Sequence, residues 1–191
     1  MKKLLIISLF FLSSCAGTQI QSSKSENFQI PEFKKVIVIA ACADLKEKQE
    51  TENVFSKELN HTALKGISYL SIFLPEKKYT DKETETLLNK SSIDGSIVII
   101  KTAEFKSERY VSPQFFDMAV MSGSHDMFYG TPMEGYYLTE GITEYKISLL
   151  DRKNNKIWCA KATTKGSNKR MVYKSLAKTT IKKLRKDGII H

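Results

Sequence analysis

The sequence predicts a single α/β domain with a mixed sheet of about five strands and about three helices. Val36 to Ala43 is an unbroken apolar run rich in β-branched residues, as is typical of a strand covered on both faces. Amphipathic segments alternate with runs of this kind, which predicts parallel βαβ units with three strands. On either side of the polar turn "DRKNNK", a further segment alternates apolar and polar residues. This pattern predicts an added antiparallel hairpin. The length of 191 residues fits one domain.

The first half of the domain follows in order from its periodicity. Residues 46–65 carry Phe55 and Leu59 at a four-residue interval, which predicts an amphipathic helix that Gly66 ends as a C-cap. "ISYLSIFLP" is the second predicted strand. Thr80 and Glu83 form a capping box that opens a short helix to residue 89, and "DGSIVIIKTAEF" is the third strand.

The second half begins after a region, 106–138, that we expect to be irregular. Tyr145, Ile147 and Leu149 alternate with polar residues, and "IWCAKATT" returns after the turn. Trp158 is the only tryptophan and is expected to pack in the core.

The chain ends with a predicted helix over 168–186, stopped by Gly188. One side carries its apolar positions, Val172, Tyr173, Leu176, Ala177, Thr180 and Leu184, and the opposite side its basic ones, Lys174, Lys178, Lys182 and Arg185. We interpret the basic side as a solvated face. A stripe that binds phosphate-bearing lipid or polysaccharide is the alternative.

The amino terminus has the proportions of a secretory leader. Lys2 and Lys3 precede an apolar run, Leu4 to Leu12, that is far shorter than the roughly 20 residues of a membrane span. Leu12-Ser13-Ser14-Cys15 resembles the lipobox of bacterial lipoproteins, which implies that 1–14 is a signal peptide and that Cys15 becomes the acylated first residue. Ala16 in place of Asp implies an outer-membrane lipoprotein facing the periplasm.

Residues 15–33 are predicted to be the acylated cysteine and a flexible tether, because "GTQIQSSKSENFQ" is polar and Ser-rich. The folded domain is then expected over 34–190. The net charge of +9 falls to +7 when two lysines leave with the leader, which gives weak attraction to anionic lipid or polysaccharide. We expect attachment to the membrane through Cys15, an envelope protein partner, no nucleic acid and no cofactor.

Two motifs resemble those of a group of small bacterial lipoproteins of unknown function. In that group a hairpin strand holds Lys-(Leu/Ile)-(Val/Ile)-Trp, and the last helix closes on Lys-Lys-Asp-Gly-Leu-Ile. Lys156-Ile157-Trp158 and the stretch 185–190 match them, and the resemblance covers about 34–190. The fold of the group is similar to the amino-terminal module of the translocation protein TolB, and to lipoproteins that activate penicillin-binding proteins or build the curli secretion channel. The resemblance implies a partner-binding envelope protein without catalytic residues.

The insert 106–138 is the predicted contact surface for that partner because its flexible thioethers and aromatic rings suit an adaptable docking surface. The candidate contact residues are Tyr110, Phe115, Phe116, Met118, Met121, Met127, Phe128 and Tyr129. The alternative function is periplasmic copper binding through the loop 118–133, because thioether and imidazole ligands suit Cu(I). Its candidate ligands are Met118, Met121, His125 and Met127.

No catalytic motif is present in the sequence. Ser124-His125-Asp126 are consecutive and cannot aim their side chains into a relay, and no spacing pairs Glu104 with another acid. The sequence therefore predicts a protein that is not an enzyme. Cys42 and Cys159 are each expected in an apolar strand, either as a disulfide or as two buried free thiols.

Overall fold

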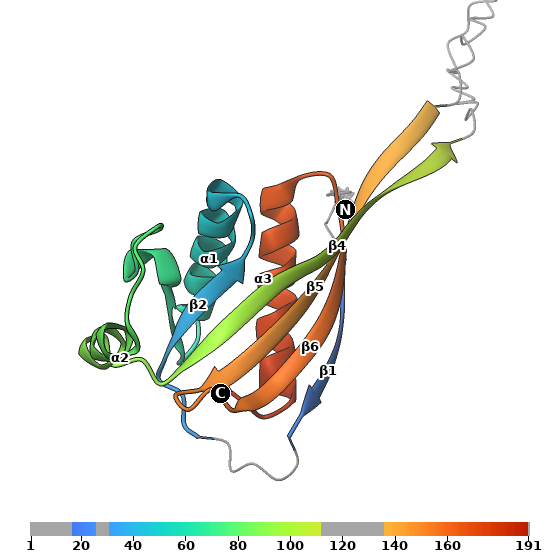
Figure 1. Ribbon diagram of the computed structural model, residues 1–191. Coiled ribbons are helices and arrows are strands. Elements are labelled where there is room, and N and C mark those ends of the chain that lie inside the picture. Colours follow the sequence, from blue (N-terminus) through green and yellow to red (C-terminus); the bar gives the residue numbers. More distant parts are fainter. Residues whose placement is uncertain (1–16, 26–30, 112–135, 191) are drawn as a thin grey trace, which may run out of the picture.

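The computed structural model describes residues 17–25, 31–111 and 136–190, and it confirms the α/β fold class with a mixed six-stranded sheet and three helices (Figure 1). The strand order across the sheet is β1-β6-β5-β4-β2-β3. β2 pairs in parallel with β3 and β4, and the remaining pairs are antiparallel. The strands are β1 (Gly17–Lys24), β2 (Lys35–Ala41), β3 (Lys65–Ser68), β4 (Gly95–Val111), β5 (Tyr136–Asp151) and β6 (Lys156–Lys165).

Helices α1 (Leu45–Leu59) and α3 (Lys169–Lys186) lie side by side on one face of the sheet (Figure 1). The main core fills the space between them and the strands, and it contains Trp158 with only 1% of its surface exposed. The predicted apolar side of the last helix is buried, as are Ile189 and Ile190 beyond it. The predicted basic side of α3 is exposed to solvent.

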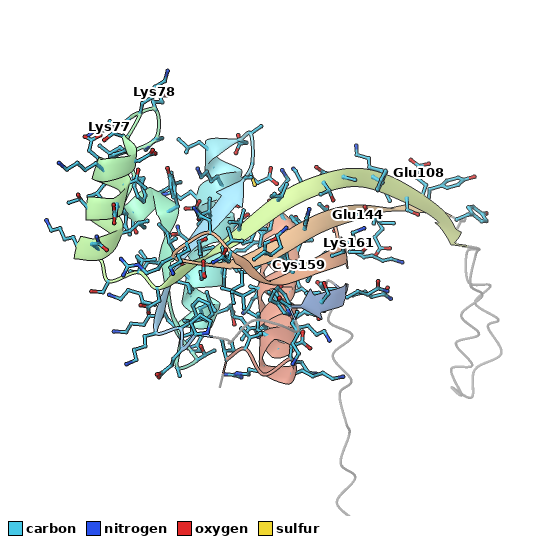
Figure 2. The ribbon with its side chains drawn as sticks, turned by 60° about the horizontal axis from the view of Figure 1, so that its bottom comes forward. Lys77, Lys78, Glu108, Glu144, Cys159 and Lys161 are labelled. Carbon is cyan, nitrogen blue, oxygen red and sulfur yellow. The ribbon has the colours of Figure 1, made fainter. Side chains whose placement is uncertain are left out.

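A smaller core lies on the opposite face, at the end of the sheet formed by β2 and β3. Helix α2 (Asp81–Lys90) covers it, and the predicted capping box of Thr80 and Glu83 opens this helix. Over β5, β6 and β1 this second face is uncovered by any described helix, and Figure 2 shows Glu144 and Lys161 projecting from it. No helix in the described ranges is long and apolar enough to cross a membrane.

The structure corrects the predicted tether, because Gly17–Lys24 is an edge strand and not a flexible segment. β1 pairs antiparallel with β6 from Gly17 opposite Lys165 to Lys24 opposite Trp158. Its side chains alternate: Ile20 packs on the main core, whereas its neighbours on the strand face solvent. The folded domain therefore includes β1, which precedes the predicted boundary at residue 34.

The structure also corrects the elements around Gly66. Helix α1 ends at Leu59 with Asn60 as its C-cap, and Gly66 lies inside β3. A Cβ at Gly66 would lie 2.8 Å from Leu59 Cδ1 and 2.9 Å from Ser56 Cα, so this position needs glycine for close packing of strand on helix.

The second predicted strand, "ISYLSIFLP", is observed only as the short strand β3, because the buried carboxylate of Glu52 ends it. Its Oε2 accepts hydrogen bonds from Ser68 Oγ at 2.7 Å and from the Leu70 amide at 3.0 Å, and its Oε1 accepts from the Ala40 amide at 3.1 Å. The chain leaves the sheet at these contacts and forms a 3-10 turn, Tyr69–Ser71.

The prediction that region 106–138 is irregular is wrong at both ends of the region. Residues 106–111 continue β4 and 136–138 open β5, so the two strands form one long hairpin that projects beyond the rest of the sheet (Figure 1). We call residues 105–111 and 136–142 the arm. Solvent reaches both sides of the arm, so no alternation of apolar and polar residues marks it in the sequence.

Candidate functional site

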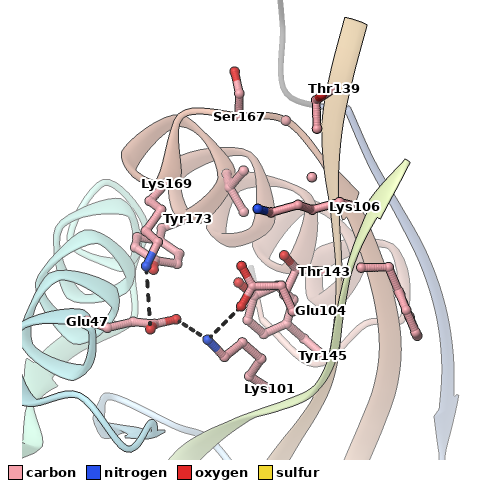
Figure 3. Close-up of a pocket in the computed structure, with 14 residues that line it drawn as sticks. Glu47, Lys101, Glu104, Lys106, Thr139, Thr143, Tyr145, Ser167, Lys169 and Tyr173 are labelled. Carbon is pink, nitrogen blue, oxygen red and sulfur yellow. Dashed lines mark hydrogen bonds and ion pairs between the residues drawn. The ribbon is translucent and has the colours of Figure 1, made fainter. Parts of the chain in front are cut away.

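A polar cleft of about 230 Å³ lies where the arm leaves the body (Figure 3). The first turns of α1 and α3 form one wall, and the helix-facing side of β4 and β5 forms the other. Its ionisable lining residues are Glu47, Lys101, Glu104, Lys106, Tyr145, Lys169 and Tyr173.

A chain of ion pairs crosses this cleft. Lys101 Nζ lies 2.8 Å from Glu47 Oε1 and 3.2 Å from Glu104 Oε2, and Lys169 Nζ lies 3.9 Å from Glu47 Oε2. The Glu47 side chain is only 11% exposed and that of Lys101 is 26% exposed, so solvent screens their contact little. The chain joins α1, β4 and α3, which are distant in the sequence.

A β-bulge in β4 makes this contact possible. Side chains three residues apart on a regular strand point to opposite faces, so Lys101 and Glu104 would be separated by the sheet. The register shifts between Lys101 and Ala103, after which Glu104 stands opposite Thr143. Both charged side chains therefore lie on the helix-covered face, a placement that their spacing in the sequence did not indicate.

Burial and contacts within the cleft shift the pKa values of Glu47, Lys101, Tyr145 and Tyr173 away from the neutral range. Burial alone would raise the pKa of Glu47, but the hydrogen bond and charge of Lys101, with further help from Tyr173 and Lys169, lower it overall. Burial and the nearby Glu47 charge raise the pKa values of Tyr145 and Tyr173 well above the usual range for tyrosine. The pKa of Lys101 is also raised, chiefly by its hydrogen bond to Glu47.

The ion pairs of this cleft tie β4 to α1 and α3 next to the base of the arm. The cleft's two carboxylates and two of its lysines bind one another across three elements, and Tyr173 donates to Glu47. A charged pair that is mostly buried and hydrogen-bonded resists sliding of β4 over the helices. None of these pKa shifts gives the cleft a proton donor and a proton acceptor whose pKa values lie near neutral pH.

The same end of the sheet carries the start of β1. One row across the strands joins Gly17, Lys165, Ile142 and Phe105. In the next row the Gly166 amide donates to the Gly141 carbonyl at 2.9 Å, and β6 ends there. Beyond this row β4 and β5 continue alone as the arm.

The described end of the arm carries a pair of exposed aromatic rings. Tyr110 and Tyr137 stand opposite each other, with ring centroids 5.2 Å apart, and are 53% and 70% exposed. Phe105 at the base of the arm is 53% exposed. Since none of these rings belongs to either core, the arm contributes surface and not packing.

Of the predicted contact residues, the structure describes only Tyr110, which it places on the arm. The remaining predicted contacts and all four candidate copper ligands lie outside the described residues. Within the described ranges no group of three or more His, Cys, Asp or Glu side chains could hold a metal ion. Glu47 and Lys101 were missed because only the fold brings α1 against β4.

Cys42 and Cys159 are both free thiols, so the disulfide alternative is wrong. β4 and β5 separate β2 from β6, which keeps the two cysteines apart. Cys42 follows the end of β2 beside the cleft, where burial and the charge of Glu47 raise the pKa of its thiol.

No family model matches this chain, and no curated protein matches it. Among solved structures it is similar to the PelC dodecamer from Paraburkholderia phytofirmans in two crystal forms. A point variant of PelC shares 11% identity at a TM-score of 0.45, over 83% of this chain and 93% of that one. PelC itself shares 12% identity at a TM-score of 0.44, over 84% of this chain and 92% of that one. Similarity at this level carries no inference about what the chain does.

Proposed function

We propose that this chain is a lipid-anchored protein of the bacterial cell envelope that binds another envelope component and catalyses no reaction. Acylated Cys15 would hold it in the outer membrane, facing the periplasm. The observation that carries the proposal is that β1, the first strand that the structure describes, starts at Gly17, two residues after the cysteine of Leu12-Ser13-Ser14-Cys15. Cleavage before Cys15 would therefore remove a leader and no residue of any described strand or helix.

The arm supports a binding role. A two-stranded hairpin that leaves the sheet and exposes aromatic rings adds nothing to either core, and such exposed apolar surface is typical of contact with a partner. The ion pairs at its base support a binding role as well, because a fixed arm presents its surface without a large loss of conformational entropy. The protonation states in the cleft support a structural use of its charges.

The anchor is tested by mass spectrometry of the amino-terminal peptide from membrane-purified protein. We expect Cys15 at the amino terminus, carrying diacylglycerol on sulfur and an acyl chain on nitrogen. Cys15→Ala is expected to leave the membrane fraction, whereas Cys42→Ala, the matched control, is expected to stay in it. Cys15→Ala retained in membranes at the wild-type level would contradict the proposal.

The binding role is tested by affinity purification from crosslinked membranes. Replacing both Tyr110 and Tyr137 by Ala is expected to reduce recovery of the partners found with the wild type. The control replaces Lys174 and Lys178 by Ala, because these side chains are also exposed but lie on α3. Unchanged partners in the arm variant would rule the arm out as the contact.

A further inference from the structure

The anchor and the arm leave the domain at the same end. Cys15 precedes Gly17 by two residues, so its Cα lies within about 7 Å of Gly17 in any conformation. The arm runs six residues past the Phe105–Ile142 pair, which stands in the same row as Gly17, and so reaches about 20 Å beyond it. The arm is therefore much longer than the link to the anchor.

This difference in length restricts how the domain sits on a bilayer. Acyl chains on Cys15 would hold Gly17 at the edge of the headgroup layer. From the row that contains Gly17, β1 and β6 run back along the body of the sheet, whereas β4 and β5 continue past that row as the arm (Figure 1). An orientation that pointed the arm away from the bilayer would push the folded body into the bilayer. In the orientations that remain, the arm lies along the headgroup layer or within it.

The side chains of the arm suit that position. Tyr110 and Tyr137 are paired and exposed, and tyrosine is enriched at the headgroup level, where its ring is buried and its hydroxyl stays hydrated. Lys106 and Glu108 on the same arm are exposed and charged, which keeps this part of the chain out of the hydrocarbon.

The corner between β6 and α3, beside Gly17, is basic. Lys165, Lys169 and Arg170 are exposed there, and basic residues near an anionic leaflet are attracted to it. The charge of this corner complements the anionic lipid surface that the geometry brings against it.

We propose that the Tyr110–Tyr137 pair lies in the headgroup layer of the membrane that holds Cys15, so that the arm meets its partner at the membrane surface. This proposal rests on the proposed function, because it requires the acylated cysteine. It adds a defined orientation and a lipid contact that the anchor alone does not supply.

The test uses the acylated full-length protein in vesicles of equal parts phosphatidylcholine and phosphatidylglycerol, with acyl chains brominated near the carbonyl end. Bromine quenches nearby indole fluorescence, and the one native tryptophan, Trp158, is buried and supplies the background. Tyr137→Trp is the reporter on the arm. Lys153→Trp is the control, because it lies in the β5–β6 turn at the opposite end of the sheet.

We expect the reporter signal to fall about twofold or more relative to vesicles without bromine, as for an interfacial aromatic residue, while the Lys153→Trp signal stays unchanged. Equal quenching of the two variants, or none in either, would overturn the proposal. The mass of the amino-terminal peptide separates the two ideas. An unmodified Cys15 overturns both, whereas an acylated Cys15 with an unquenched reporter overturns only the lipid contact.

Discussion

The indole Nε1 of Trp158 donates a hydrogen bond to Asp187 Oδ2 at 2.8 Å. These residues belong to the hairpin and carboxyl-terminal motifs on which the resemblance to small lipoproteins rests. The same carboxylate accepts from Ser22 Oγ at 2.5 Å and pairs with Lys183 Nζ at 3.1 Å. Asp187 thus joins β6, β1 and α3, and residues of both motifs contribute to this contact within the fold.

We predict that Asp187→Ala lowers the free energy of unfolding by about 1.5–3 kcal/mol, since it removes a charged acceptor from a buried indole. Chemical denaturation measures the change. Trp158→Phe removes the donor together with part of the buried ring; because the hydrogen bond is lost in either single variant, the double variant should lose less than the sum of the two single losses. Strict additivity would show that the two side chains are not coupled.

The Asp187 carboxyl also makes the stability of the fold depend on pH, and the direction of its pKa shift fixes the sign of that dependence. Burial raises its pKa, but hydrogen bonds from Ser22, Trp158 and Lys183 lower it below the ordinary value of 3.8 overall. The folded state therefore binds this proton more weakly than the unfolded state does. Its stabilising contribution is complete above pH 3.8 and is lost as the pH falls through the lower folded-state pKa. Denaturation of wild type and Asp187→Asn across acidic pH should show the two stabilities converging as the pH falls.

How much the sequence could predict depends on which faces of each strand are buried. Val36 to Ala41 was predictable because the two cores bury both of its faces, which gives an unbroken apolar run, and the last helix because the main core imposes a helical period on it. β1 and the arm were missed because at least one of their faces is open to water, and only Ile20 marks the buried side of β1. The cleft was missed because a bulge sets which face Glu104 occupies, and no residue pattern announces that register shift.

The buried Glu52 is expected to be among the most sensitive positions of the fold. Glu52→Ala removes the acceptor of two backbone amides and one hydroxyl, at a cost of about 3–5 kcal/mol. Glu52→Gln keeps one acceptor oxygen and should lose less. Thermal unfolding measures both, with the exposed Glu50→Ala as the control. Equal stability of Glu52→Ala and wild type would mean that these hydrogen bonds contribute nothing.

In the cleft, Lys101→Met should raise the pKa of Glu47, because it removes the hydrogen bond and the charge that lower that pKa. The stabilisation from Glu47 is present above its ordinary pKa of 4.5 and is lost as the pH falls through the lower folded-state value, so the variant should lose this part of the acid dependence. Carbon-detected NMR titration of the Glu47 carboxyl measures the shift. Lys153→Met, far from the cleft, should leave it unchanged.

Close packing predicts that alanine substitution destabilises the protein at one glycine and not at another. Gly66→Ala should destabilise the protein by about 1–3 kcal/mol, because its Cβ would lie 2.9 Å from the backbone of Ser56, which cannot turn aside. Gly17→Ala is the matched control, since its Cβ meets nothing within 4 Å and alanine suits an edge strand at least as well. Denaturant midpoints of the two variants measure the difference. Equal losses at both positions would show that the contact between β3 and α1 is not close enough to need glycine.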